Sequence, residues 1–256
     1  MVDARRLELP TPSMSRRYSN QLSYASVPGI ITDIFFIAIK IHLVKILSMK
    51  DVAGKIIAFM DVVEKLCHVK RHTLMPGGRA ETDSDHVMKL CFLVMMASPY
   101  IKRPHDAQRM LEMALVHDLV EADAGDTPVI DQINTPEIKA DKAARERKAI
   151  EKYRDMLPPE IGNKIYDLFL EFEEQKTFEA RLVRVLDKFE GNIQCNKENH
   201  GARYYAMGIT AMLDAMERHE FSAALDAEEI IRAIEVVLAE NAKNNIEYCK
   251  KHGLIP

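Results

Sequence analysis

Apolar residues recur at steps of three and four positions along nearly the whole chain from Met49 onward. This spacing is that of one face of an α-helix. Two such stripes consist of Ile56, Met60 and Val63, and of Val87, Leu90 and Val94. Only 10 glycines and 11 prolines interrupt the 256 residues, and we find no convincing run of alternating strand-type residues. The chain is therefore predicted to be all-α, a single helical bundle of about seven to nine helices.

Proline, glycine and capping residues divide this pattern into separate helices. Asp106, which follows Pro104, begins a helix that is expected to continue to about residue 124, before Gly125. The residue pair Pro158-Pro159 separates the next two helices. We expect these two and the later helices at about residues 137–156, 160–174, 178–198, 203–219 and 226–251.

The first fifty residues differ in charge from the rest of the chain. They carry seven basic and three acidic residues, a net charge of +4, whereas the other 206 residues carry −8. Three charged residues interrupt the apolar run from Ile30 to Leu47, so it lacks the roughly 18 uncharged residues of a membrane span. The run could form an amphipathic helix packed on the body, an interfacial membrane helix, or part of a poorly folded extension before a functional start at Met49. We expect residues 1–48 to form a basic N-terminal extension and residues 49–256 to form the helical domain.

The four cysteines are widely separated and include no Cys-x-x-Cys pair. This pattern indicates neither a disulfide framework nor a thiolate zinc site, so we expect a reducing, cytoplasmic compartment. The net charge of −4 argues against non-specific binding to nucleic acid. Neither nucleic acid nor, given the charges within the apolar run, a membrane is an expected partner.

Polar residues interrupt apolar helical stretches at three places. His117-Asp118 follows a run of apolar residues, His86 begins an apolar stripe, and Asp187 interrupts another. A buried carboxylate without a partner is costly, so each of these groups should be paired with something. On one continuous helix, His117, Asp118 and Glu121 would face one side within about 100°. Two His and two Asp of this kind are a nitrogen and oxygen ligand set for a divalent metal, such as Mn, Co, Fe, Ni or Mg.

The order of these residues is specific. The chain carries in sequence His86, His117-Asp118 and Asp187. This order resembles the H…HD…D signature of the HD-domain metal-dependent phosphohydrolases. The segment Glu81-Thr-Asp-Ser-Asp-His86 resembles the approach to the first His in that family, and HDLVEADAGDTP, which begins at His117, resembles its 5′-deoxynucleotidase branch. The segment that ends at Lys188 resembles the helix that supplies the last Asp of that branch, and the similarity covers about residues 50–200.

The resemblance implies roles for the polar residues. His86, His117, Asp118 and Asp187 would bind one divalent cation, which activates a water for attack on phosphorus. Glu121 would orient or deprotonate that water, or protonate the leaving alkoxide.

The resemblance also implies substrate contacts. Asp126 would contact the sugar 3′-hydroxyl and crowd a 2′-hydroxyl, and Arg71 would bind the 5′-phosphate through its guanidinium group. Members of the branch commonly carry an aromatic residue, often Trp, after that arginine, whereas this chain has His72 there and no Trp. His72 could stack on the substrate instead, or Arg79 could be the phosphate ligand, and both possibilities stay open.

The activity implied by the resemblance is divalent-metal-dependent hydrolysis of nucleoside 5′-monophosphates, preferentially 2′-deoxy, to nucleoside and phosphate by a homodimer. The alternatives are an HD hydrolase of another nucleotide phosphoester and a catalytically degenerate, nucleotide-sensing HD module. The presence of all four ligands together with Glu121 argues against the degenerate module, because a sensor does not need a water-activating carboxylate.

Overall fold

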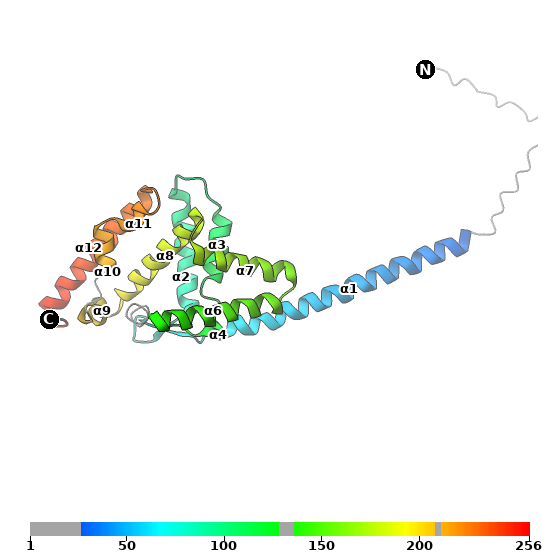
Figure 1. The fold of residues 1–256 in the computed structure, drawn as a ribbon, viewed down its shortest axis with the longest axis horizontal. Helices are drawn as coiled ribbons and strands as arrows, with labels where there is room; N and C mark the ends of the chain where they lie inside the picture. The colour runs from blue at the N-terminus through cyan, green and yellow to red at the C-terminus, as the bar shows by residue number, and fades with distance from the viewer. Residues whose placement is uncertain (1–26, 128–135, 208–210) are drawn as a thin grey trace, which may run out of the picture. The chain divides into compact units, whose positions relative to one another are not determined.

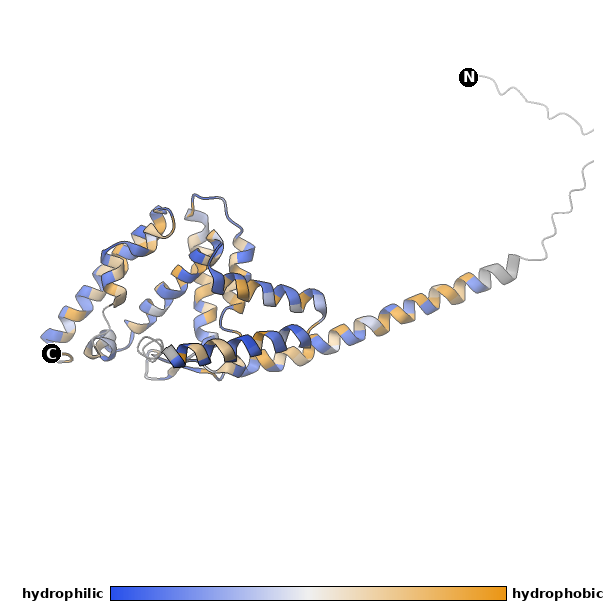
Figure 2. Cartoon of the chain, viewed as in Figure 1, coloured by the Kyte–Doolittle hydropathy of each residue, from blue (hydrophilic) through white to orange (hydrophobic). Residues whose placement is uncertain are grey.

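The structure of the protein is a computed structural model that describes residues 27–127, 136–207 and 211–256 (Figure 1). The chain divides into two compact units, residues 1–49 and residues 50–256. Helix α1 (Val27–Leu66) contains the predicted apolar run, and Figure 2 shows hydrophobic residues along this part of the helix. Residues 1–26 of the predicted extension lie outside the described residues. None of the described helices combines the length and the apolar composition that a membrane crossing requires.

The second unit is built almost entirely of helices, which confirms the predicted all-α class. The longer ones are α2 (Asp83–Ala97), α3 (Ala107–Val116), α6 (Pro136–Met156), α7 (Pro159–Glu174), α8 (Phe178–Cys195), α10 (Ala211–Glu217) and α12 (Glu229–Lys251). The shorter ones are α4 (Glu121–Ala124), α9 (Ala202–Ala206), α11 (Glu220–Ala223) and the 3₁₀ helices η1 (Ser98–Tyr100) and η2 (Glu198–Gly201). With α1, eight helices of the described residues are seven residues or longer.

Helices α2, α3, α7 and α8 form the centre of the bundle (Figure 1). Helix α2 packs on α3 and α8, and α3 packs on α7 and α8. The fully buried side chains between them include Leu90, Met110, Met113, Leu182, Leu186 and Phe189. The polar residues predicted to bind a metal therefore come from the helices that enclose this core and from the turn that follows α3.

The expectation that the chain has no strands is wrong for one short segment. Strands β1 (Lys70–Leu74) and β2 (Ala80–Thr82) pair antiparallel, with Lys70 opposite Thr82, Leu74 opposite Ala80 and an irregularity between the two pairs. Gly77 and Gly78 form the connection with φ of 90° and 84°, a conformation that favours glycine. Strands of five and three residues are too short to give a readable alternation in sequence.

The prediction of one continuous helix from Asp106 to residue 124 is also wrong. Helix α3 ends at Val116, His117 is its C-cap, and α4 begins at Glu121. The backbone between them makes bonds of the 3₁₀ type, from the N–H of Leu119 to the carbonyl of Val116 and from the N–H of Glu121 to the carbonyl of Asp118, both 3.0 Å. The 100° rotation of a regular helix therefore does not set the directions of these side chains.

The later helix boundaries need smaller corrections. The helix expected at 178–198 ends at Cys195, and the helix expected at 203–219 is divided into α9 and α10, with residues 208–210 outside the described residues. The last helix begins at Glu229 rather than at Asp226, because Asp226 and Ala227 have positive φ values of 56° and 61°. Such a conformation cannot continue into an α-helix.

Candidate metal centre

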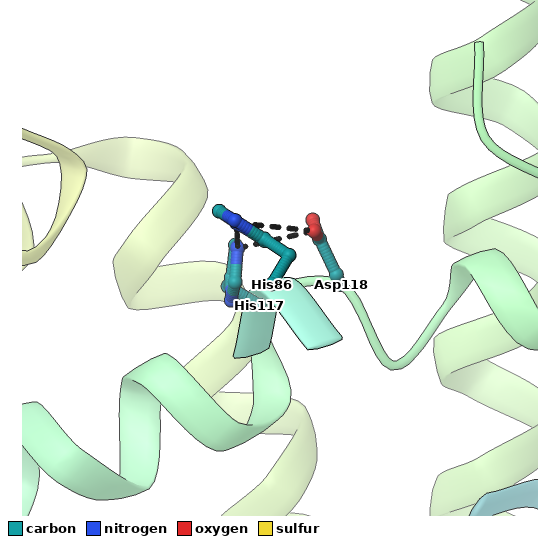
Figure 3. Close-up of side chains that lie close together, drawn as sticks. All are labelled: His86, His117 and Asp118. Atoms are coloured by element: carbon teal, nitrogen blue, oxygen red, sulfur yellow. Dashed lines mark hydrogen bonds and ion pairs between the residues drawn. The ribbon is translucent and has the colours of Figure 1, made fainter. Parts of the chain in front are cut away.

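Four predicted side chains meet at one place in the bundle. His86 comes from α2, His117 from the end of α3, Asp118 from the turn that follows, and Asp187 from α8. Nε2 of His86 lies 3.3 Å from Nε2 of His117 and 3.0 Å from a carboxylate oxygen of Asp187. A carboxylate oxygen of Asp118 lies 3.2 Å from Nε2 of His117 and 3.7 Å from Nε2 of His86. Figure 3 shows the side chains of His86, His117 and Asp118 pointing toward one another.

The other ring nitrogen of each histidine already has a partner. Nδ1 of His117 donates to the carbonyl oxygen of Ala114 at 2.9 Å, and Nδ1 of His86 donates to a carboxylate oxygen of Glu190 at 2.5 Å. An acceptor at Nδ1 places the proton there, so the neutral ring presents a lone pair at Nε2. Two such lone pairs 3.3 Å apart cannot satisfy each other, whereas a cation can accept both together with the two carboxylates. The donor set therefore fits a divalent metal ion.

The charges within the cluster keep its carboxylates ionised. Burial lowers the pKa of His86, but without a cation its hydrogen bonds, above all to Asp187, outweigh burial and raise that pKa to about 10. In that metal-free state Nε2 carries a second proton, which a bound cation would replace. Burial raises the pKa of Asp118, yet the charges of His117 and Arg71 bring it well below its ordinary value. Burial also raises the pKa of Asp187, and the hydrogen bond and charge of His86 reverse that effect. Ionised carboxylates are the form that binds a cation.

Arg71 on β1 lies beside this cluster and Arg79 does not. Nη1 of Arg71 is 3.0 Å from a carboxylate oxygen of Asp118 and 3.2 Å from one of Asp83. Arg79 is exposed, and its guanidinium group binds both carboxylate oxygens of Asp85 at 2.7 and 3.1 Å. Of the two candidate phosphate ligands, only Arg71 is therefore close to the metal ligands.

His72 and Asp126 lie near Arg71. His72 has an exposed side chain, and its carbonyl oxygen accepts a hydrogen bond of 3.0 Å from the hydroxyl of Tyr204. Asp126 follows Gly125, whose φ is 75°. Burial raises the pKa of Asp126, while the charges of Arg71 and His72 act in the opposite direction. These interactions place the carboxylate of Asp126 within the electrostatic reach of both residues.

Glu121 is almost completely buried, with an exposed fraction of 3%. Its Oε1 is 2.9 Å from Nζ of Lys142 on α6, and no group of the described residues hydrogen-bonds to its Oε2. Burial raises the pKa of Glu121 to about 8; Lys142 opposes this shift and the charge of Asp118 adds to it. The carboxyl group can therefore be protonated at neutral pH, which is the state of a general acid.

Several residues of this region were not identified from the sequence. Glu190 lies three positions after Asp187 on α8, and this i, i+3 spacing was an available signal. Lys142 and Arg145 lie in a helix with many charges, where the pattern does not reveal which side chains turn inward. Arg145 donates to the carbonyl of Ala124 and, at 3.0 Å, to the hydroxyl of Thr127, so it holds the segment that carries Asp126.

Comparisons with known proteins show what this chain is similar to. The 5′-deoxynucleotidase HDDC2 of Xenopus laevis is 32% identical over 145 residues, which is 56% of this chain and 69% of that protein. The human protein of the same name is 30% identical over 148 residues, 57% of this chain and 69% of the relative. The crystal structure of a predicted metal-dependent phosphohydrolase from Magnetospirillum magnetotacticum MS-1 has a TM-score of 0.62 at 23% identity, covers 80% of this chain and 98% of that chain, and thus shows the same fold.

The family of this chain is shown by a family model whose matched range includes the four clustered side chains. The family model described as HD domain matches residues 63–227, which is more than half of the 256 residues. This range contains His86, His117, Asp118 and Asp187, as well as the strand that carries Arg71. The resemblance inferred from the order of these residues is thereby confirmed: the chain belongs to the HD-domain family.

Proposed function

We propose that the protein is a divalent-metal-dependent phosphomonoester hydrolase that converts nucleoside 5′-monophosphates, preferentially 2′-deoxy, to nucleoside and phosphate. The observation that carries this proposal is the guanidinium group of Arg71, 3.0 Å from Asp118, beside a cluster of two His and two Asp. Metal-dependent hydrolysis of a phosphoester requires a cationic side chain that binds the phosphate group and, next to it, residues that bind a metal ion. The relatives named 5′-deoxynucleotidase support the substrate class.

The direct test is phosphate release from a panel of ribo- and deoxyribonucleoside 5′-monophosphates. Protein freed of metal by a chelator should release no phosphate, and addition of Mn²⁺, Co²⁺ or Mg²⁺ should restore release, fastest with the deoxy substrates. A fully metal-loaded protein that releases phosphate from none of them would contradict the proposed activity.

His86, His117, Asp118 and Asp187 would hold the cation, which when bound supplies Lewis-acid activation of water and of phosphate oxygens. The side chains of this chain supply the rest. Arg71 binds two oxygens of the 5′-phosphate and orients the phosphorus. Glu121, protonated below its pKa of about 8, gives a proton to the departing 5′-oxygen, or takes one from the attacking water when it is ionised. Asp126 would accept a hydrogen bond from the sugar 3′-hydroxyl.

The substitution Arg71→Ala should mainly raise KM. It removes charge-assisted hydrogen bonds to phosphate that contribute about 1.5–3 kcal/mol, which corresponds to an increase in KM of roughly 10- to 150-fold. The matched control is Arg79→Ala, which removes an exposed arginine bound to Asp85 and should leave KM within about twofold of the wild-type value. Steady-state kinetics with one deoxynucleoside monophosphate measure both. If Arg79→Ala raises KM and Arg71→Ala does not, the phosphate ligand is Arg79.

The substitution Asp126→Ala should narrow the preference for deoxy substrates. It removes the acceptor proposed to fix the 3′-hydroxyl and with it the close approach that disfavours a 2′-hydroxyl. A 2′-hydroxyl crowded in this way costs about 1 kcal/mol, so the ratio of kcat/KM between deoxy and ribo substrates of the same base should fall by about fivefold. An unchanged ratio would show that Asp126 does not set the sugar preference.

We further propose that residues 1–48 form an extension that the fold does not need. The family match begins at residue 63. Among the residues of α1 whose burial is described (33–66), the buried ones, Phe59, Val62 and Leu66, all lie after Met49. Deletion of residues 1–48 should leave a monodisperse protein with kcat/KM within about twofold of the full chain, measured by size-exclusion chromatography and phosphate release. An insoluble or inactive product would place the apolar run within the fold.

We also propose a cytoplasmic homodimer. One face of α2 carries four apolar side chains that are each more than half exposed: Met88, Phe92, Met95 and Met96. An apolar stripe at this spacing is suited to burial against a second copy of the chain. Sedimentation velocity of the full chain tests the oligomeric state.

A further inference from the structure

Lys89 connects two buried carboxylates next to the metal ligands. It lies one helical turn after His86 on α2, and its Nζ is 2.8 Å from a carboxylate oxygen of Glu190. The same ammonium group contacts a carboxylate oxygen of Glu81, and it donates to the side-chain oxygen of Gln194 at 2.7 Å. Glu81 and Glu190 are 1% and 3% exposed. A cation in contact with both carboxylates offsets part of the cost of burying them.

The network reaches from a metal ligand to the phosphate-binding candidate. At one end Glu190 accepts the hydrogen of Nδ1 of His86 at 2.5 Å. At the other end an oxygen of Glu81 lies 3.6 Å from Nε of Arg71. Gln194 adds a second link to strand β1, because its amide nitrogen donates to the carbonyl of Leu74 at 2.7 Å. Helices α2 and α8 and the strand pair β1–β2 are thus joined by one set of polar contacts.

This acidic cluster is not a second metal site. Glu81, His86 and Glu190 lie close enough together to hold a metal ion. However, the ammonium group of Lys89 already contacts both carboxylates and supplies the positive charge. The remaining contact of Glu190 is with the nitrogen of His86 that faces away from Asp187 and His117.

We propose that Glu190 is a positioning residue of the metal centre and that Lys89 holds Glu190 in place. A carboxylate at Nδ1 fixes the tautomer of His86, directs its Nε2 toward Asp187 and His117, and increases the basicity of the ring. Glu190 acts through His86 and does not itself bind the cation or the substrate. This inference rests on the metal centre of the proposed function.

The test is the affinity of the metal-free full chain for Co²⁺, followed by the visible absorbance of the bound ion without substrate. Glu190→Ala should weaken the Co²⁺ Kd by about 10- to 100-fold, the range found when partners of metal-binding histidines are removed. Glu190→Gln keeps an acceptor oxygen of the same shape but loses the charge, so its Kd should lie between those of the wild type and Glu190→Ala. Glu174→Ala and Glu174→Gln, at an exposed glutamate that ends α7, are the matched controls and should bind as the wild type does.

A second pair of variants tests Lys89. Lys89→Met removes the charge between Glu81 and Glu190 and should weaken Co²⁺ binding, whereas Lys89→Arg keeps a cation with several donors and should stay within about threefold of the wild type. Circular dichroism of each metal-free variant identifies loss of fold. If Glu190→Ala is unfolded without metal, the Co²⁺ Kd values of Glu190→Gln and Lys89→Met, each compared with the wild-type value, test the positioning role instead.

The outcomes separate this inference from the proposed function. The positioning role alone is overturned if the Glu190→Ala protein is folded and its Co²⁺ Kd lies within about threefold of the wild-type value. The same conclusion follows if Glu190→Gln and Lys89→Met are both folded and both have a Co²⁺ Kd within that range. A wild-type chain that binds no Co²⁺ overturns the metal centre and the positioning role together. A wild type that binds Co²⁺ with the predicted dependence on Glu190, yet hydrolyses no nucleotide, supports this inference and contradicts the proposed activity.

Discussion

The His117→Ala protein is expected to lose its divalent cation and nearly all release of phosphate. His117 supplies one of the two Nε2 atoms that lie 3.3 Å apart, and its ring is fixed by the hydrogen bond to Ala114. Its removal leaves one histidine and two carboxylates, a set that binds first-row metal ions much more weakly. The same result is expected for Asp118→Ala, because its oxygen lies 3.2 Å from Nε2 of His117.

Metal content after gel filtration and phosphate release at saturating substrate measure this prediction. The controls are His68→Ala and Asp155→Ala, which change an exposed histidine and an exposed aspartate of the same chain and should leave both quantities unchanged. Full turnover with Co²⁺ or Mn²⁺ by His117→Ala or Asp118→Ala would remove these residues from the metal centre.

The substitution Glu121→Gln is expected to lower kcat by about 10²–10⁴ while metal content stays near the wild-type value, which is the loss typical of a positioned acid or base. Glutamine keeps the shape of the side chain and can still accept from Lys142, but it cannot exchange a proton. If Glu121 were only a structural residue, turnover would change little. A kcat within about threefold of the wild type, with metal bound, would exclude Glu121 as the proton-transferring carboxyl group.

The pH dependence of stability checks the state of Glu121 independently of turnover. Burial raises its pKa from the ordinary 4.5 to about 8 in the folded protein. Between these values the folded state binds more protons at this group than the unfolded state, so its contribution to stability is fully present below pH 4.5 and is lost as the pH rises toward 8. In the metal-free protein, Glu121→Gln should therefore raise Tm relative to the wild type at pH 8.5 more than at pH 5. An equal difference in Tm at both pH values would contradict a raised pKa.

The residues proposed to bind the metal could be singled out from the sequence because each is a polar residue within an apolar stretch. His86, Asp187 and the pair His117-Asp118 meet as expected. The geometric reason given for the pair was wrong, however, since α3 ends at Val116. Nothing in the apolar pattern distinguishes a helix that continues from one that tightens for a turn and begins again, because both bury residues at the same spacing.

The choice between Arg71 and Arg79 could not be made from the sequence. Both lie in the segment that precedes His86, and each is followed by acidic residues that could pair with it. The strand pair separates the two arginines in space: it brings Arg71 against Asp118 and leaves Arg79 to bind Asp85 at the surface, and for this reason Arg71 is the one proposed to bind phosphate. That pairing depends on a turn at Gly77-Gly78 between strands too short to be recognised. The partner Lys142 likewise depends on how separate helices pack, whereas Glu190 could have been found from its i, i+3 spacing to Asp187.

Strand β2 and helix α2 are joined without a linker. Thr82 is both the last residue of β2 and the N-cap of α2: its side-chain oxygen accepts from the N–H of Asp85 at 3.3 Å, and its own N–H donates to Asp85 at 2.9 Å. This capping box ties the end of the strand pair that carries Arg71 directly to the first turn of the helix that carries His86. If Arg71 binds phosphate and His86 binds the cation as proposed, this direct junction would help to set the distance between the two groups and so the size of the phosphate group that fits between them.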